Sequence, residues 1–160
     1  MHLLKQLLIL SITIITFKSF SQTGPGGVGT DDGTSDLKIW YQANSGVSTT
    51  GVLIDNVTNA AGVIALDISE TGTQRPTLAL AAVNGYPEMT FSGSNRLRTG
   101  LTLTTSNFIT NQASSFVVNK ASTYSQNSCV YTTDPLVGST RFTNHIPWGG
   151  TVYYDIGNCC

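Results

Sequence analysis

Short apolar runs alternate with clusters of turn-forming residues from Asp36 onward. In residues 89–92 and 101–104 every second residue is apolar, and Thr or Ser stands between, which is the period of a strand with one buried face. The runs follow one another at roughly 8–15-residue spacing, which is typical of β-sandwiches and barrels. The pattern therefore predicts an all-β fold built from antiparallel strands.

Dipeptides that favour tight turns separate several of the apolar runs, among them Ser45-Gly46 and Asn84-Gly85. Asn-Gly between two alternating runs is a strong signal for a two-residue hairpin. The segments between turns that we predict to be strands are 38–43, 52–57, 63–68, 77–80, 88–92, 96–103, 115–120, 128–132, 140–146 and 151–156.

Residues 1–21 have the features of a signal peptide. Lys5 precedes an apolar run over 7–17, and Ser19 and Ser21 give small residues before a cleavage point at Gln22. Lys18 ends the run well short of the ~20 apolar residues that a membrane-spanning helix needs. We expect an exported protein, secreted or at the cell surface, with no membrane span after the leader is removed.

Residues 22–35 are rich in Gly and poor in apolar side chains, so we expect a flexible lead-in to the domain over 36–160. Asp31, Asp32 and Asp36 stand close together here and raise the question of calcium, which prefers oxygen ligands. The stretch lacks the spacing and the distal Glu of an EF-hand loop, so we expect a solvated turn and no cofactor.

Composition narrows the class of protein further. Charged residues make up 11% of the chain and hydrophobic residues 40%, and removal of the leader leaves six Lys and Arg against nine Asp and Glu. No basic surplus is available to neutralise phosphates, so we do not expect nucleic-acid binding. The chain has 23 Thr but only two Glu and four Lys, which fits an extracellular β protein better than a helical bundle.

Two stretches resemble bacterial concanavalin A-like (laminin-G-like) jelly-roll modules. Residues 37–47, LKIWYQANSGV, are similar to the opening strand and turn of such modules. Residues 75–94, with RPTL followed by NGYPEMTFSGS, resemble their next signature, an Asn-Gly-x-Pro turn and a strand that ends in Phe-x-Gly. The resemblance implies a jelly-roll-like β-sandwich, incomplete at its C-terminus, and a sugar-binding or adhesive role in secreted or surface-displayed bacterial proteins.

We do not expect catalysis. Jelly-roll glycoside hydrolases need paired carboxylates on one strand face, whereas Glu70 and Glu88 are 18 residues apart and the spacing of Asp67 and Glu70 points them to opposite faces. The single His after the leader, His145, has no Gly-x-Ser-x-Gly motif to accompany it, and the His and Cys residues lack the spacing of a zinc site. A fragment of a glycan-active enzyme, with its catalytic strand beyond Cys160, is an alternative.

Sugar binding by a β-sandwich uses aromatic rings that stack on the sugar and polar groups that hydrogen-bond its hydroxyls. A spacer domain without a ligand is the other alternative to a glycan-binding or adhesive module. We expect Trp40, Phe91, Phe116 and Phe142 in the core. The candidates for glycan contact are Tyr86 beside Asn84, Trp148 beside Asn144 and His145, and Tyr153 or Tyr154 with Asp155.

The cysteines all lie late in the chain. In an exported protein a disulfide is the default expectation. Cys129 lies in one predicted strand, and Cys159 and Cys160 follow another, so neighbouring strands would bring Cys129 near one of the two. The alternative is that all three are thiols that face different layers.

Overall fold

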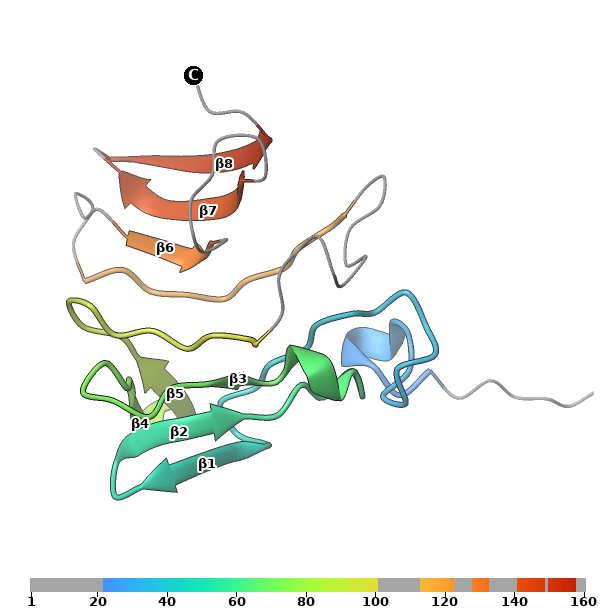
Figure 1. Cartoon of the computed structure of the whole chain (residues 1–160), viewed down its shortest axis with the longest axis horizontal. Helices are drawn as coiled ribbons and strands as arrows, with labels where there is room; N and C mark the ends of the chain where they lie inside the picture. The colour runs from blue at the N-terminus through green and yellow to red at the C-terminus, as the bar shows by residue number, and fades with distance from the viewer. Residues whose placement is uncertain (1–21, 101–112, 123–127, 133–140, 149, 158–160) are drawn as a thin grey trace, which may run out of the picture. The chain divides into compact units, whose positions relative to one another are not determined.

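The structure, a computed structural model, describes residues 22–100, 113–122, 128–132, 141–148 and 150–157. The chain divides into two compact units, Met1–Gly100 and Leu101–Cys160. In the described residues every strand pair is antiparallel and the regular structure is β apart from two short 3-10 turns, which confirms the all-β class (Figure 1). The predicted signal peptide lies outside the described residues.

The first unit contains one five-stranded sheet. Its strands follow the order β1-β2-β4-β5, and β3 pairs with β2 beside this path. The strands are β1 (Val47–Thr50), β2 (Leu53–Val57), β3 (Ile68–Ser69), β4 (Thr77–Val83) and β5 (Tyr86–Thr90).

Strands β4 and β5 form the hairpin that Asn84-Gly85 predicts. Asn84 has φ 51° and Gly85 has φ 82°, and the strands close on the pair Val83 and Tyr86. Two successive positive φ angles are what a type I′ turn requires, and Asn and Gly adopt them at the lowest cost. β5 ends the strand order of its sheet, and Pro87 lies within it.

The core of the first unit lies around β2 and the loop that follows it. Ile54 and Val57 on β2 are fully buried, as is Ala61, and Leu66 is 6% exposed. The register shift between Ser48 and Thr49 leaves one extra residue on β2, so Ile54 pairs with Thr49 and Val57 pairs with Val47. Because Val47 and Thr49 are two residues apart on β1, Ile54 and Val57 lie on the same face of the sheet, and this is the face that the core covers.

Two predicted strands of this unit, 38–43 and 63–68, are wrong, and a third, 96–103, forms only an isolated bridge between Arg98 and Ser69 over its described residues 96–100. Residues 38–43 form no strand, because the backbone of Trp40 bonds a loop: its N–H donates to Asn59 Oδ1 at 2.8 Å and its carbonyl accepts from Ala60 N at 2.8 Å. The middle of 63–68 is the 3-10 helix η2 (Ile64–Leu66), and β3 begins at Ile68.

The second unit has three strands in the order β6-β7-β8: β6 (Ser128–Tyr131), β7 (Arg141–Trp148) and β8 (Thr151–Gly157). They confirm the last three predicted strands to within a few residues. Residues 115–120, by contrast, form no strand. β7 lies between β6 and β8, so the strand of Cys129 and the strand that leads to Cys159 are not neighbours. Cys159 and Cys160 lie outside the described residues, and the disulfide stays a prediction.

Two aromatic residues expected in the core are on the surface instead. Phe91 is 52% exposed and follows the end of β5, and Phe116 is 96% exposed. Both side chains are exposed because residues 91 and 116 lie outside every strand of the described chain, so strand pairing does not hold them in a sheet. Trp40 is partly buried, and the side chain of Phe142 lies outside the described part.

The segment 22–35 makes more contacts than its composition led us to expect. It includes the 3-10 turn η1 (Pro25–Gly27), and the backbone of Asp31 and Gly33 packs so closely on Gly62 that a Cβ there would lie 2.3 Å from the Asp31 carbonyl oxygen. Its flexibility stays a prediction. No helix among the described residues is long and apolar enough to span a membrane.

Candidate functional site

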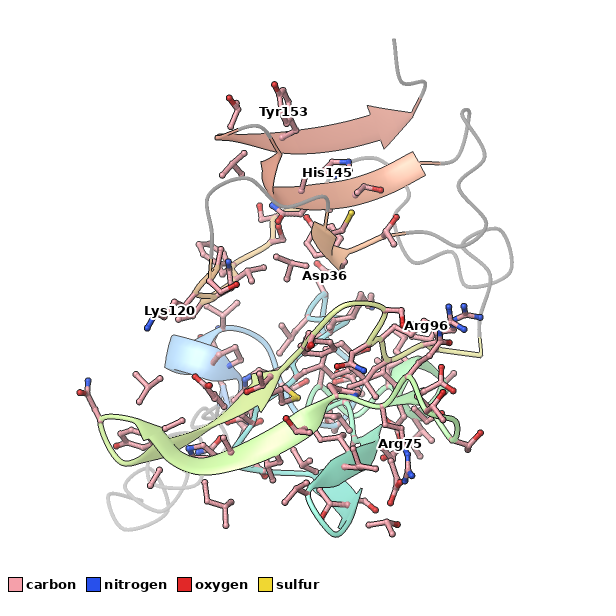
Figure 2. All side chains as sticks on the ribbon, turned by 90° about the vertical axis from the view of Figure 1, so that its left-hand side faces the viewer. Asp36, Arg75, Arg96, Lys120, His145 and Tyr153 are labelled. Carbon is pink, nitrogen blue, oxygen red and sulfur yellow. The ribbon has the colours of Figure 1, made fainter. Side chains whose placement is uncertain are left out.

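The tip of the β4–β5 hairpin brings together two of the predicted site residues. Asn84 and Gly85 are both exposed, and the Tyr86 side chain is 66% exposed. The type I′ turn holds all three at the end of a hairpin, which Figure 2 shows as a long yellow-green ribbon. An exposed aromatic side chain and an exposed amide therefore lie at the same hairpin tip, separated in sequence only by Gly85.

The end of β4 that leads into the turn of this hairpin arm is apolar and exposed as well. Leu80 is 75% exposed and Val83 is 51% exposed, and no charged residue occurs between Thr77 and Pro87. Ala81 has φ 63°, and the strand register shifts between Ala79 and Val83. A positive φ at Ala and a register shift together indicate a bulge, which increases the local twist of the arm.

For the predicted residues of the second unit, the structure describes the side chains of some and only the backbone of the others. On β7, Asn144 and His145 are consecutive, so their side chains point to opposite faces of the sheet. Asn144 is only 3% exposed, and its buried amide is poorly placed to meet a ligand. The strand pairing therefore does not bring Asn144 and His145 to a common surface.

His145 belongs to a row of residues that crosses the three strands. It pairs with Cys129 on β6 and with Tyr153 on β8, and its Nδ1 lies 3.4 Å from the Cys129 Sγ. Tyr153, labelled with His145 in Figure 2, is 47% exposed. This row gives a second accessible aromatic ring beside a polar group.

The three other predicted residues are placed by backbone register alone. Tyr154 pairs with Asn144, Asp155 pairs with Thr143, and Trp148 pairs with Thr151. The side chains of Trp148, Tyr154 and Asp155 lie outside the described part of the structure, so their role in ligand contact stays a prediction.

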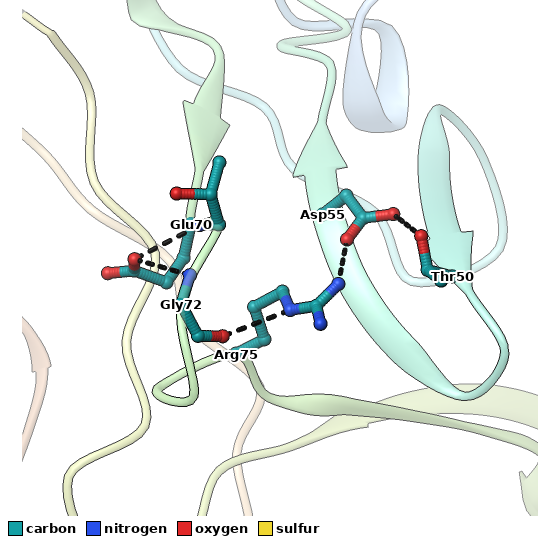
Figure 3. A network of polar contacts seen from close by, with 6 residues as sticks. Thr50, Asp55, Glu70, Gly72 and Arg75 are labelled. Atoms are coloured by element: carbon teal, nitrogen blue, oxygen red, sulfur yellow. Dashed lines mark hydrogen bonds and ion pairs between the residues drawn. The ribbon is translucent and has the colours of Figure 1, made fainter.

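A polar network that the sequence did not predict connects β2 with the loop before β4 (Figure 3). Asp55 accepts a hydrogen bond from Thr50 Oγ1 at 2.7 Å and forms an ion pair with Arg75, whose Nε also donates to the Gly72 carbonyl at 3.1 Å. These bonds, first from Thr50 and then from Arg75, lower the pKa of Asp55. The network joins β2 to the loop that leads into β4.

Glu70 anchors the same loop from its other end. Its Oε1 accepts from the backbone N–H of Thr71 at 3.0 Å and of Gly72 at 3.2 Å, and its Oε2 accepts from Arg96 Nε at 3.2 Å. These bonds, those from the backbone of Gly72 and Thr71 foremost, lower the pKa of Glu70. Each carboxylate of the network thus has donors within the protein, and its role is to hold the loop.

Asn59 and Tyr41 bond the residues at the two ends of η2, and we call this cluster of polar contacts the corner. Asn59 is 2% exposed, and besides the bond from Trp40 N its Nδ2 donates to the carbonyls of Lys38 at 2.8 Å and Val63 at 3.1 Å. The Tyr41 hydroxyl donates to the Leu66 carbonyl. Burial, with a contribution from the charge of Asp67, raises the pKa of Tyr41 above its ordinary value of 10.0.

The aspartates of the lead-in have donors close by in the chain. Asp32 Oδ1 accepts from Thr30 Oγ1 at 2.6 Å and from both the hydroxyl and the backbone N–H of Thr34, and these bonds lower its pKa from 3.8 to about 2. Asp31 Oδ1 accepts from Thr23 Oγ1 at 2.6 Å. The described residues contain no group of three or more His, Cys, Asp or Glu side chains arranged to hold a metal ion.

Comparison with protein-family models, with curated proteins and with solved structures finds no match to this chain. The resemblance to jelly-roll modules therefore rests on the sequence motifs themselves. One of those motifs, residues 84–94, contains the hairpin tip with Asn84 and Tyr86.

Proposed function

We propose that the chain is an exported, non-catalytic module of a bacterial surface protein that binds glycans or mediates adhesion, with a jelly-roll-like β-sandwich as its fold. The observation that carries the proposal is the exposure of Tyr86, at 66%, beside the Asn84 amide at the tip of a tight turn. Burial of a Tyr ring is favourable, and a ring left exposed at a protruding tip is available to a partner.

The geometry suits a sugar for two reasons. The ring offers an apolar face to the C–H surface of a pyranose, and the Asn84 amide offers two N–H donors and two acceptor lone pairs to its hydroxyls. The type I′ turn fixes the backbone of Asn84 and Gly85 in advance, so binding loses little further backbone freedom there. The arm also carries no charge from Thr77 to Pro87, which favours a neutral ligand over a phosphate.

Export by the predicted leader is part of this proposal and has its own test. The h-region and the Ser19-Phe20-Ser21 stretch support cleavage before Gln22. Intact-mass analysis of material secreted by a bacterial host is expected to show a chain that begins at Gln22. Secreted material that retains Met1 would refute export by this leader.

Glycan binding is tested with the secreted protein on an array of neutral and charged glycans, followed by affinity measurement on the strongest neutral ligand. We expect Tyr86→Ala to weaken binding about tenfold or more, as the loss of an aromatic anchor does. Tyr153→Ala is the matched control, since it removes an exposed Tyr from the other unit, and it is expected to leave that affinity unchanged.

Two results would contradict the proposed site or the proposed function. If Tyr153→Ala weakens binding and Tyr86→Ala does not, the site belongs to the row with His145 rather than to the hairpin. If no glycan binds, the spacer domain without a ligand becomes the better interpretation.

A further inference from the structure

The turn at the tip of the hairpin has a chemical property that is independent of any ligand. Asn84-Gly85 is the one Asn-Gly dipeptide in the sequence. Both residues are exposed, and open space surrounds the Gly85 Cα, because a Cβ built there would meet no atom within 4 Å. Water and the Asn84 side chain can therefore reach the peptide bond between Asn84 and Gly85.

Hydrogen bonding leaves the reacting groups available. The hairpin ladder closes on Val83 and Tyr86, which flank the turn, so Gly85 lies outside the ladder. Within the described residues, neither the Gly85 N–H nor the Asn84 side chain makes a hydrogen bond. The backbone nitrogen that follows Asn84 is therefore not held by a carbonyl of the sheet.

Other asparagines of the same unit are held in place. Asn59 is 2% exposed, and the nitrogen after it, that of Ala60, donates to the Trp40 carbonyl at 2.8 Å. Asn95 uses its Oδ1 to accept from Ser92 N at 2.9 Å, and the following nitrogen, of Arg96, donates to the Gln74 carbonyl at 2.9 Å. In both cases the side chain and the next nitrogen are engaged, so cyclisation would have to break hydrogen bonds.

We propose that Asn84 is a site of spontaneous deamidation. The deprotonated Gly85 nitrogen attacks the Asn84 Cγ, a bond between N and Cγ forms, and the Cγ–Nδ2 bond breaks. The nitrogen leaves as ammonia after it takes up a proton from water, and a five-membered succinimide remains. Water then opens the ring at one of its two carbonyls, which gives aspartate or isoaspartate at position 84.

The product changes both the charge and the backbone of the tip. Either product adds one negative charge to the stretch from Thr77 to Pro87, which has no charged residue. Isoaspartate also carries the chain through its side-chain carbon, so the turn gains one backbone atom and no longer has the geometry of a two-residue type I′ turn. The pairing of Val83 with Tyr86 is then expected to weaken.

The experiment is to store the purified secreted protein at mildly alkaline pH and to follow each Asn peptide by mass spectrometry that resolves aspartate from isoaspartate. We expect the peptide with Asn84 to convert first and the peptides with Asn59 and Asn95 to stay largely intact in the folded protein. Asn84→Gly, which keeps a residue suited to positive φ, is expected to abolish the conversion at the tip.

The matched control is Asn95→Gly, which should leave the conversion of Asn84 unchanged. A second arm stores the protein in denaturant, where the bonds of Asn59 and Asn95 are lost, and we expect these two residues to approach the rate of Asn84 more closely than in the folded state. Conversion of Asn59 or Asn95 before Asn84 in the folded protein would overturn the proposal, as would an Asn84 that stays intact. A failure of glycan binding bears on none of these results.

Discussion

The corner around Asn59 and the arm formed by β4 and β5 use the same residue types in opposite ways. In the corner, Asn59 is buried and its amide is fully engaged, and Leu66, whose carbonyl accepts from Tyr41, is 6% exposed. In the arm, Asn84 is exposed and Leu80 is 75% exposed. The comparison teaches that the corner contributes to stability, whereas the arm presents side chains to the outside.

The two regions also differ in how far apart in the sequence their interacting residues are. The bonds of Asn59 reach Lys38 and Trp40, about twenty residues away in sequence, and Tyr41 reaches Leu66 across 25 residues. The tip of the arm is closed by Val83 and Tyr86, which are separated only by the turn. Substitutions in the corner should therefore affect the whole unit, and substitutions at the tip should act locally.

The same substitution at the two leucines gives the largest expected contrast. Leu66→Ala removes a buried side chain and is expected to lower the free energy of unfolding by about 2–4 kcal/mol. Leu80→Ala removes an exposed one and is expected to change it by no more than about 0.5 kcal/mol. Urea unfolding followed by tryptophan fluorescence measures both. Equal losses for the two variants would show that the arm is packed and not exposed.

The asparagines provide the next comparison. Asn59→Ala leaves the Trp40 N–H and the Lys38 carbonyl without their partner and is expected to cost about 2–3 kcal/mol. Asn95→Ala removes a single bond at the surface and is expected to cost about 0.5–1 kcal/mol. The same urea titration applies. A cost for Asn59→Ala no greater than for Asn95→Ala would contradict the role of the corner.

Tyr41 makes the corner sensitive to alkaline pH. Its pKa in the folded protein lies above the ordinary value of 10.0, so the folded state favours the neutral phenol. This contribution to stability is fully present below the ordinary pKa and is lost as the pH rises above it. We expect the urea midpoint to fall above about pH 10. Tyr41→Phe should remove this part of the alkaline loss, and an unchanged alkaline profile in that variant would rule it out.

The smallest change in stability is expected at acid pH, and it comes from carboxylates outside both the corner and the arm. The pKa values of Asp32, Asp55 and Glu70 are lowered in the folded protein, so their contribution is present above the ordinary values and is lost as the pH falls. The loss is expected to begin near pH 4.5, the ordinary value for Glu70, and to continue to about pH 2 for Asp32. The urea midpoint measured as a function of pH checks this. Asp32→Asn should reduce the fall of the midpoint at the lowest pH values, and a pH dependence identical to that of the unchanged protein would refute the assignment to Asp32.

Local signals were sufficient to predict the arm. Asn84-Gly85 specified a turn that needs two positive φ angles, and residues 89–92 after it alternate between apolar and polar side chains, so the hairpin followed from neighbouring residues. β2 and the three strands of the second unit were predicted for the same reason. β1, with the sequence VSTT, was missed because its residues lack an apolar alternation.

The corner could not be predicted in this way. The apolar run at 63–68 fits a short helix as well as a strand, and the structure has η2 there. The segment 38–43 has the composition of a strand, but the side chain of Asn59 takes the bond that a neighbouring strand would supply. The ion pair of Asp55 with Arg75 joins residues 20 apart, and no pattern in the sequence links them.

Pro87 affects how readily the arm associates with other copies of the chain at high protein concentration. A long apolar hairpin at the end of a sheet is a natural template for the addition of further chains, strand upon strand. Pro87 has no N–H to offer to an incoming strand, and Glu88 next to it places a carboxylate in the same short strand. The arm can thus keep Leu80, Val83 and Tyr86 exposed while β5 interrupts the continuous row of donors on which fibrillar growth depends.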